Sequence, residues 1–285
     1  MTDPRDLFRQ YLSQQIALGH SSVTLPRPVG TSAAPAAPEN GASPLTDAPA
    51  PPPRSVEATP RTAARGAGRR DKARWQADLP AIPPAGITVP APDTDLFATD
   101  PLTSASFDTV VAQIRACTRC RLHAGRTHAV PGEGPTDARL VVVGEGPGAN
   151  EDAQGRPFVG RAGDLLNEIL AAIDCPRETV YIANVVKCRP PENRKPQGDE
   201  MDACMPYLHR QLALIRPKVV LAMGATAAEA LLQTRASLAQ LRNRVHEYRG
   251  IPLVVTYHPA ALLRNPNWKR PTWDDVRIAR QLLDR

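Results

Sequence analysis

Two groups of residues in the sequence have types and spacings that suit chemistry, and the first is a set of cysteines. The segment "CTRC" places Cys117 and Cys120 two residues apart from each other, Cys188 stands in the polar, basic segment "KCRPPENRKP", and Cys204 lies in the next predicted helix. Two thiolates at the first spacing can share one metal centre that two more thiolates complete, and spacing alone does not distinguish a zinc ion from an iron–sulfur cluster. Cys188 and Cys204 could instead be small buried residues, but the basic loop around Cys188 favours ligation. Cys175 is expected to be a free buried thiol.

The second group consists of polar and aromatic residues that follow apolar, strand-like segments. Its members are Glu145, Gly146, Glu151, Phe158, Asn184, Asn193 and His258. Taken singly, the phenylalanine could be a core residue, an asparagine a turn cap and the histidine a structural residue. Together, an aromatic face, an amide and an imidazole suit the recognition of a flat heterocycle, because an amide can pair with its donor and acceptor edge. The turn after the first strand is acidic and has no lysine, which argues against phosphate binding.

The elements that must position these residues alternate along the chain. Apolar, β-branched segments at 139–145, 179–187, 218–224 and 251–257 alternate with helical patterns at 162–173, 198–215, 226–233 and 272–283, and a short helix at 107–116 ends before Cys117. Strands that are apolar on both faces predict a three-layer α/β fold, with a four-stranded parallel sheet and helices on both faces. Ligands of such sheets bind beyond the carboxyl ends of the strands, where the second group lies.

Composition divides the chain into a globular part and an N-terminal region. The globular pattern covers 106–285, whereas the first hundred residues hold 16 of the 31 prolines and few large apolar residues. We therefore predict a disordered Pro/Ala-rich linker over 21–105. Its arginine-rich stretch "RTAARGAGRRDKARW" is either a solvated linker or a basic arm that contacts phosphates. Residues 1–20 could form a short helix that docks on a protein partner, or a frayed terminus.

Charge and hydropathy limit the classes of function. The formal charge of +6 and the pI near 9.3 favour a polyanionic partner. No apolar run is long enough for a membrane span, and the first residues do not resemble a secretory signal. A cytoplasmic protein is expected, and in a reducing cytosol metal ligation explains paired cysteines better than disulfides do.

Three segments and the cysteine set carry a resemblance to a known family. "GEGPGANEDAQGRPFVGRAG", "NVVKCRPPENRKP" and "HPAALLR", with four cysteines at these positions, resemble the family-four uracil-DNA glycosylases, which are bacterial and archaeal repair enzymes. The resemblance covers about 106–285. It implies a 4Fe–4S cluster, rather than zinc, on Cys117, Cys120, Cys188 and Cys204. It also implies a monomer of the bacterial cytosol or nucleoid whose substrate is uracil-containing DNA, single- or double-stranded. Such enzymes flip uracil out of the DNA and hydrolyse its N-glycosidic bond, leaving an abasic site for base excision repair.

The resemblance also implies roles for single residues. Phe158 should stack on uracil, Asn184 should pair with its polar edge, and the Gly146 backbone should lie at the base. His258 should donate to the carbonyl oxygen that gains charge as uracil leaves. The positioning of the attacking water is left open among Glu145, Glu151 and Asn193. Leu262 is the expected wedge that enters the base stack, with Arg264 on a nearby phosphate and Leu263 packed inward.

Three other readings are considered. One is a related glycosylase that acts more broadly on deaminated bases. Another is a non-catalytic DNA-binding protein with a metal-stapled α/β domain, which would not need Phe158, Asn184 and His258. A third, a variant that traps uracil covalently, would carry an additional basic loop after the first motif, and the sequence has none.

Overall fold

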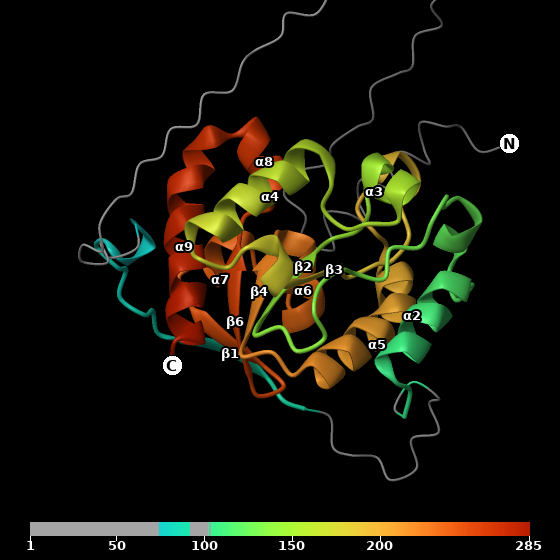
Figure 1. Ribbon diagram of the computed structural model, residues 1–285, viewed down its shortest axis with the longest axis horizontal. Helices are drawn as coiled ribbons and strands as arrows, with labels where there is room; N and C mark the ends of the chain where they lie inside the picture. Colours follow the sequence, from blue (N-terminus) through green and yellow to red (C-terminus); the bar gives the residue numbers. More distant parts are fainter. Residues whose placement is uncertain (1–73, 92–101, 103) are drawn as a thin grey trace, which may run out of the picture. The chain divides into compact units, whose positions relative to one another are not determined.

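The structure is a computed structural model that describes residues 74–91, 102 and 104–285 (Figure 1). The possible helix at 1–20 and most of the predicted linker lie outside the described residues. The strands are β1 (Ala85–Val89), β2 (Leu140–Gly144), β3 (Tyr181–Asn184), β4 (Val219–Met223), β5 (Val245–Tyr248) and β6 (Ile251–Thr256). The helices are α2 (Phe107–Ala116), α3 (Ala149–Gln154), α4 (Gly160–Ala172), α5 (Gly198–Ile215), α6 (Ala225–Leu232), α7 (Leu238–Leu241), α8 (Pro259–Arg264) and α9 (Lys269–Leu283). Short 3-10 helices are η1 (Arg74–Gln76), η2 (Arg121–Ala124), η3 (Arg177–Thr179), η4 (Pro191–Asn193) and η5 (Pro266–Trp268).

The four strands predicted from the sequence form the parallel part of one sheet. In the described residues the strand order is β1-β5-β6-β4-β2-β3, and β6, β4, β2 and β3 run parallel to one another. Gly144 at the end of β2 pairs with Asn184 at the end of β3, and Met223 pairs with Thr256 across β4 and β6. The loops that carry the candidate site residues therefore leave the same edge of the sheet.

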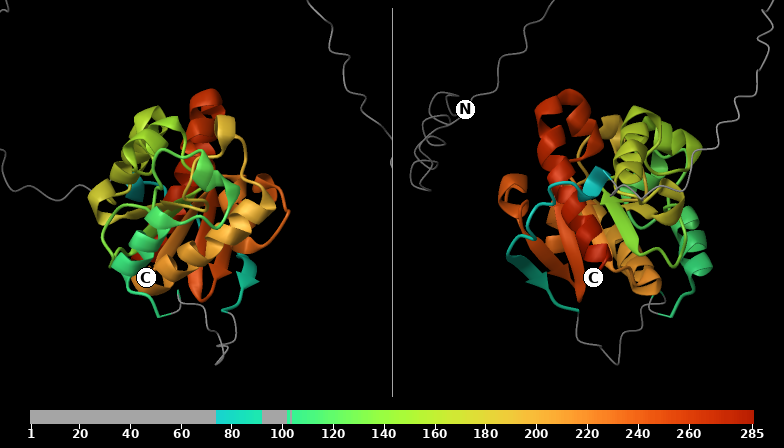
Figure 2. Two further views of the ribbon diagram at one scale, coloured as in Figure 1. Left: turned by 90° about the vertical axis from the view of Figure 1, so that its right-hand side faces the viewer. Right: turned by 60° about the vertical axis from the view of Figure 1, so that its left-hand side comes forward.

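Two further strands extend the predicted sheet to six. β5 runs antiparallel to β6, to which the turn Arg249–Gly250 joins it, and β1 pairs parallel with β5 (Figure 2). The buried His246 side chain holds β1 in place, because its Nδ1 accepts a hydrogen bond from Ile87 N at 2.9 Å. The prediction of a disordered linker over 21–105 is thus wrong for 74–91. There a short apolar strand, flanked by prolines, obtains its backbone hydrogen bonds from β5.

Helices cover both faces of the sheet, as predicted. On one face α2, α5 and α6 pack on alternate strand residues such as Val141 and Val143, and on the other α4 and α9 pack on Leu140 and Val142 (Figure 1). The parallel strands have buried side chains on both faces, which explains why they are apolar without alternation. Within the described residues we find no helix with the length and apolar character of a membrane span.

Candidate active site

A cavity of about 760 Å³ opens at the carboxyl ends of the parallel strands. Each of the seven residues of the second sequence group lines it, and so does Arg264. Further lining residues come from the end of β4 and the start of α6, from α7, from the end of β6 and from η5; they include Met223, Gly224, Ala225, Thr226, Leu238, Ala239, Tyr257 and Trp268. The structure thus brings together residues that lie more than a hundred positions apart in the sequence.

The turn after β2 places a carboxylate and a closely packed backbone at the cavity. The Glu145 carboxylate accepts a hydrogen bond from the hydroxyl of the buried Thr226. Gly146 follows, and a Cβ at this position would lie 2.7 Å from Val186 Cγ2. Only glycine therefore fits here without moving the loop that follows β3. Without a side chain, the backbone of the turn also stays open to the cavity.

Glu151 ties two loops together. Its carboxylate accepts hydrogen bonds from the backbone N–H groups of Gly148 at 3.1 Å and Val159 at 2.9 Å. Glu151 and Asn193 both line the cavity, but in the described residues they share no hydrogen bond. The Glu151 carboxylate instead fixes the acidic turn to the segment that carries Phe158.

Phe158 and Asn184 meet above the end of β2. A Cβ on Gly144 would lie 2.5 Å both from Phe158 Cζ and from Asn184 Oδ1, so the strand must end in glycine. Asn184 is 2% exposed, and its side-chain amide has no hydrogen-bond partner among the described residues. The amide atoms are not among the buried polar atoms that lack a partner, so they are open to the cavity, where a ligand can pair with both the donor and the acceptor.

Backbone contacts hold both residues in place. Phe158 adopts a positive φ of 48°, and Arg177 Nη1 donates to its carbonyl oxygen at 3.1 Å. The buried Lys187 donates through Nζ to the carbonyl oxygen of Asn184 and to Gln211 Oε1, each at 2.8 Å. The aromatic ring and the amide are therefore fixed before any ligand arrives.

His258 is a neutral donor with a defined tautomer. Its ring stacks on Phe158, with the centroids 5.2 Å apart, and its Nδ1 accepts a hydrogen bond from Ala260 N at 3.2 Å, at the start of α8. Because Nδ1 is an acceptor, the proton of the neutral ring is on Nε2. Burial, and then the charge of Arg264, lower the pKa of His258 to about 4. The ring thus offers one N–H group and no positive charge at neutral pH.

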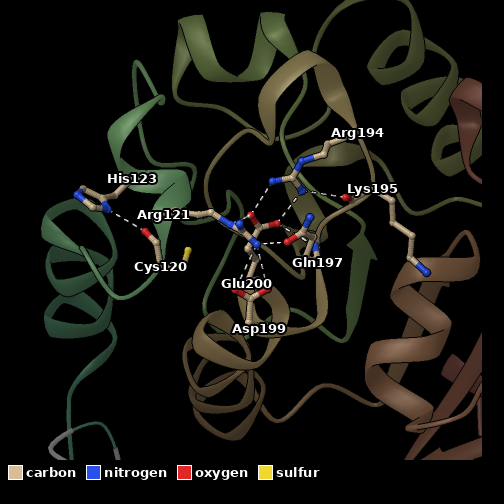
Figure 3. A network of polar contacts seen from close by, with 8 residues as sticks. All are labelled: Cys120, Arg121, His123, Arg194, Lys195, Gln197, Asp199 and Glu200. Atoms are coloured by element: carbon tan, nitrogen blue, oxygen red, sulfur yellow. Dashed lines mark hydrogen bonds and ion pairs between the residues drawn. The ribbon is translucent and has the colours of Figure 1, made fainter. Parts of the chain in front are cut away.

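The loop that carries Asn193 is held by a charge network (Figure 3). Glu192 and Asn193 have positive φ values of 54° and 55°, and Arg189 Nε donates to Asn193 Oδ1 at 2.8 Å. The next residue, Arg194, donates through Nη1 and Nη2 to the two carboxylate oxygens of Glu200 at 2.8 and 2.7 Å. The Glu200 side chain is fully buried, so this bidentate pair holds in place the loop backbone with its two positive φ angles.

The same carboxylate reaches the cysteine-bearing segment. Arg121, next to Cys120, donates through Nε to Glu200 Oε1 at 2.9 Å, and Gln197 N donates to Glu200 Oε2 at 2.8 Å (Figure 3). These contacts lower the pKa of Glu200 to about 2, with the Arg194 hydrogen bonds as the largest cause. Glu200 therefore joins η2, α5 and the Asn193 loop.

The four predicted ligand cysteines line one small cavity on the α2 and α5 side of the sheet. Cys117, Cys120, Cys188 and Cys204 all border it. Donors already point at the sulfur atoms, since Arg126 Nη1 lies 3.0 Å from Cys188 Sγ and Lys187 N lies 3.3 Å from Cys204 Sγ. Four thiols that border one cavity, two of them with N–H donors to sulfur, are residues of the type that hold an iron–sulfur cluster. In the described residues no group of three or more His, Cys, Asp or Glu side chains is arranged to hold a metal ion.

Cys175 belongs to neither site. It is free, 8% exposed, and packs in the core on the opposite face of the sheet with α4 and α9. The expectation of a free buried thiol is confirmed.

The structure reverses the predicted roles of the two leucines in α8. Leu262 is 1% exposed and packs inward, whereas Leu263 is 38% exposed. The reason is helical phase: α8 begins at Pro259, and its buried face carries Pro259 and Leu262. The assignment of Leu262 as the wedge is therefore wrong for this structure. Leu263 is the exposed leucine, and it lies next to Arg264, which lines the cavity.

Sequence reasoning missed several residues of the site. Gly224 follows β4 and Thr226 lies in the first turn of α6, at a strand end where a site was expected but no residue was named. Glu200 lies within a predicted helix and was not singled out. The spacing of opposite charges in "NRKPQGDE" could have indicated its ion pair with Arg194. The aromatic pair Tyr257 and Trp268 was not considered because only the fold brings its members together.

Comparison with known proteins agrees with this geometry. A family model, the uracil DNA glycosylase superfamily, matches residues 131–278. The type-4 uracil-DNA glycosylase of Sulfurisphaera tokodaii is 41% identical over 186 residues, which are 62% of this chain and 84% of the relative. The type-4 enzyme of Pyrobaculum aerophilum is 45% identical over 161 residues (54% and 82%). That of Thermotoga maritima is 44% identical over 178 residues (61% and 93%). Since the similarity extends over most of the length of each relative, the chain belongs to the uracil DNA glycosylase superfamily, within its type-4 group.

Proposed function

We propose that the protein is a uracil-DNA glycosylase, which hydrolyses the N-glycosidic bond of a flipped uracil and leaves an abasic site. The observation that supports this most is the Asn184 amide, which has no hydrogen-bond partner among the described residues and lines, beside the Phe158 ring, a cavity that also holds the neutral His258. A base is planar and uncharged, and its edge supplies the partners that the amide lacks. The backbone of Gly146 borders the same space.

His258 acts on the leaving group. As the glycosidic bond breaks, negative charge develops on the uracil ring, and the Nε2–H group of a neutral imidazole donates to the carbonyl oxygen that receives it. A donor of this kind is commonly worth about 10²–10³ in rate. Because the ring starts uncharged and its N–H group is a very weak acid, it stabilises the departing anion by a hydrogen bond without transferring its proton.

The sugar becomes cationic in the same step, and Glu145 supplies the facing negative charge. Glu151 accepts hydrogen bonds from two backbone N–H groups, whereas Glu145 is bonded to a single hydroxyl. We therefore assign the ordering of the loops to Glu151, and the positioning of the attacking water to Glu145 with Asn193. Gly146 has no side chain and so contributes no base of its own.

Leu263 takes the wedge role. It is an exposed apolar side chain next to Arg264, which lines the cavity, and a wedge must project from the surface to replace the flipped base. Arg264 is exposed beside it and is suited to a phosphate of the same strand.

Cys117, Cys120, Cys188 and Cys204 are proposed to hold a 4Fe–4S cluster. Such a cluster would cross-link the segments that carry these cysteines. Lys187, next to Cys188, donates to the carbonyl oxygen of Asn184. Glu200 accepts from Arg121, next to Cys120, and from Arg194, next to Asn193. Its role here is to hold the fold of the site. The enzyme is expected to act as a monomer in the cytosol or nucleoid of a bacterium, where its DNA substrate lies.

The test is excision from oligonucleotides that carry uracil, hypoxanthine or thymine, single- and double-stranded. Release of uracil with alkali-labile strand breaks at its position is the expected result. Comparable release of hypoxanthine would favour the broader glycosylase, and tight binding of uracil DNA without any release would favour the non-catalytic alternative.

A further inference from the structure

An aromatic stack at the mouth of the cavity remains outside the chemistry described above. Trp268 lies face to face with Tyr257, with ring centroids 4.7 Å apart and planes 3° apart. The Arg242 guanidinium lies 4.6 Å from the centroid of the same tyrosine ring. Since one ring face cannot take both partners, the three groups form a continuous stack with the indole at one end.

The inner end of this stack is anchored in the core. Arg242 forms a bidentate pair with the buried Asp275, through Nε at 2.7 Å and Nη2 at 3.0 Å, and Asp275 also accepts a hydrogen bond from Thr256 at 2.8 Å. Tyr257 directly precedes His258. The stack is thus held in a fixed position relative to the uracil pocket, which removes much of the entropy cost of binding to it.

The outer end of the stack is free. Trp268 is 36% exposed, and large exposed apolar side chains are few in the described part of the chain: besides Trp268 they are Leu79 and Leu263. Trp268 and Leu263 both belong to the elements at the cavity mouth, and Trp268 lines the cavity itself. An exposed tryptophan already stacked on one side offers its other face to a planar ligand.

The charges around the indole indicate which planar ligand fits. Arg264, Lys269 and Arg270 are all exposed on the same stretch of chain, and among the described residues neither Arg264 nor Lys269 has an ion-pair partner. A flat apolar face surrounded by exposed cations is the arrangement with which proteins bind single-stranded nucleic acid, by base stacking and phosphate contact.

We propose that Trp268 forms a second base-binding subsite, on which a nucleobase next to the target uracil unstacks from the strand and stacks on the indole. The proposal depends on the proposed function, because it needs DNA in the cavity. It differs from the wedge, which fills the gap that the flipped base leaves in a duplex. A stacking platform also acts on single-stranded DNA, where no such gap exists.

The experiment is a double-mutant cycle on single-stranded oligonucleotides. The target is a non-cleavable 2′-fluorinated deoxyuridine, and three strands are compared: one with both neighbouring bases, one with an abasic 5′ neighbour and one with an abasic 3′ neighbour. Wild type is expected to bind one of the two abasic strands about 5-fold or more weakly than the intact strand. This factor corresponds to the low end of the free energy of base–aromatic stacking. Trp268→Ala should bind the intact strand as weakly as wild type binds that abasic strand. The affinity of Trp268→Ala should not fall further when the neighbouring base is absent.

Two further variants control the comparison. Trp268→Phe keeps a ring and should retain part of the preference for the intact strand. Trp273→Phe changes a tryptophan of helix α9, which directly follows Trp268, and Trp273 does not line the cavity, so this variant should behave as wild type. Quenching of tryptophan fluorescence by the intact strand should persist in Trp273→Phe and be lost in Trp268→Phe.

The outcomes separate the subsite from the proposed function. If Trp268→Ala binds the intact strand as wild type does, or if its loss adds to that of the abasic neighbour, the subsite does not exist. Uracil excision by wild type on the same strands, made with ordinary deoxyuridine, is scored independently. Excision with an additive cycle refutes only the subsite, and no excision refutes the proposed function.

Discussion

At the scale of single residues, His258 carries the largest share of the proposed chemistry. His258→Ala removes the Nε2–H donor but leaves Phe158 and Asn184 to hold the base. We expect the single-turnover excision rate to fall about 10²-fold or more, with little change in affinity for uracil DNA. Rapid-quench kinetics at saturating enzyme, with binding measured on a non-cleavable substrate, checks this. A near-normal rate in this variant, together with a lost rate in Glu145→Ala, would place catalysis on the turn after β2.

The protonation of His258 leads to a second expectation. Burial lowers its pKa to about 4, below the ordinary value of about 6.5. The neutral donor therefore persists from pH 8 down to about pH 5, and the single-turnover rate should show no loss near pH 6.5. The contribution of His258 to stability is present above pH 6.5 and is lost as the pH falls towards 4. A rate that halves near pH 6.5 and shifts in His258→Gln would contradict this.

The two adjacent leucines of α8 provide a matched pair. Leu263→Ala removes an exposed side chain and should slow uracil excision from duplex DNA more than from single strands, with little change in the free energy of unfolding. Leu262→Ala opens a cavity in the core and should cost about 2–4 kcal/mol of stability. Denaturant unfolding and excision assays on both substrates separate the two. Equal effects on duplex excision without loss of stability would restore Leu262 as the wedge.

At the scale of elements, Glu200 joins η2, α5 and the Asn193 loop, and its neighbour Asp199 supplies the control. The Glu200 side chain is fully buried and pairs with Arg121 and Arg194, whereas Asp199 is exposed and pairs only with Arg121. We expect Glu200→Gln to cost about 2–3 kcal/mol and to lower the excision rate, because the backbone at Glu192 and Asn193 loses its anchor. Asp199→Asn should cost less than about 0.5 kcal/mol. Similar stabilities of the two variants would show that the network does not hold the loop.

The cysteine-bearing segments make a further prediction at this scale. The purified protein should be brown, and iron and sulfide should be present in equal amounts. Cys188→Ser should lose the colour and unfold at lower denaturant, because it removes one of four links between segments. Cys175→Ser, on the other face of the sheet, should keep the colour. Stoichiometric zinc without iron in anaerobically prepared protein would contradict the cluster, and equal bleaching in both variants would contradict the choice of ligands.

The sequence predicts the elements whose pattern is strong and misses those that depend on tertiary contacts. The apolar strands and the helix 198–215 are recognisable because both faces of a strand, or one stripe of a helix, must be buried. β5 is not recognisable, since "VHEY" is short and has two polar residues in succession, and its partner β1 lies about 160 residues earlier. The exchange of Leu262 and Leu263 depends on where α8 begins, which sequence alone places only to within a residue or two. Contacts such as Thr226 to Glu145 or Trp268 to Tyr257 exist only in the folded chain.

At the scale of the whole molecule, two truncations of the N-terminal region should differ, because one keeps the segment 74–91 that carries β1 and the other removes it. All cavity residues follow Gly144, so deletion of 1–73 should leave excision from short oligonucleotides intact at low salt. Affinity should fall modestly at higher salt if the arginine-rich stretch contacts phosphates. Deletion of 1–91 also removes β1 and the buried Trp75, whose Nε1 bonds Asp174 at 2.7 Å. It should lower the thermal midpoint by about 10 °C. Equal midpoints for the two truncations would show that β1 adds no stability.

During synthesis on the ribosome, strand β1 emerges long before the strand with which it pairs. Ile87 bonds to His246, a separation of 159 residues, and a ribosome needs about 10–30 s to synthesise that length. During this time "AGITV" has no native partner, and in the finished protein it pairs with β5 at the edge of the sheet. Pro83 and Pro84 precede the segment and Pro90 follows it. Because proline cannot donate to a strand ladder, these residues limit pairing with other nascent chains until β5 emerges.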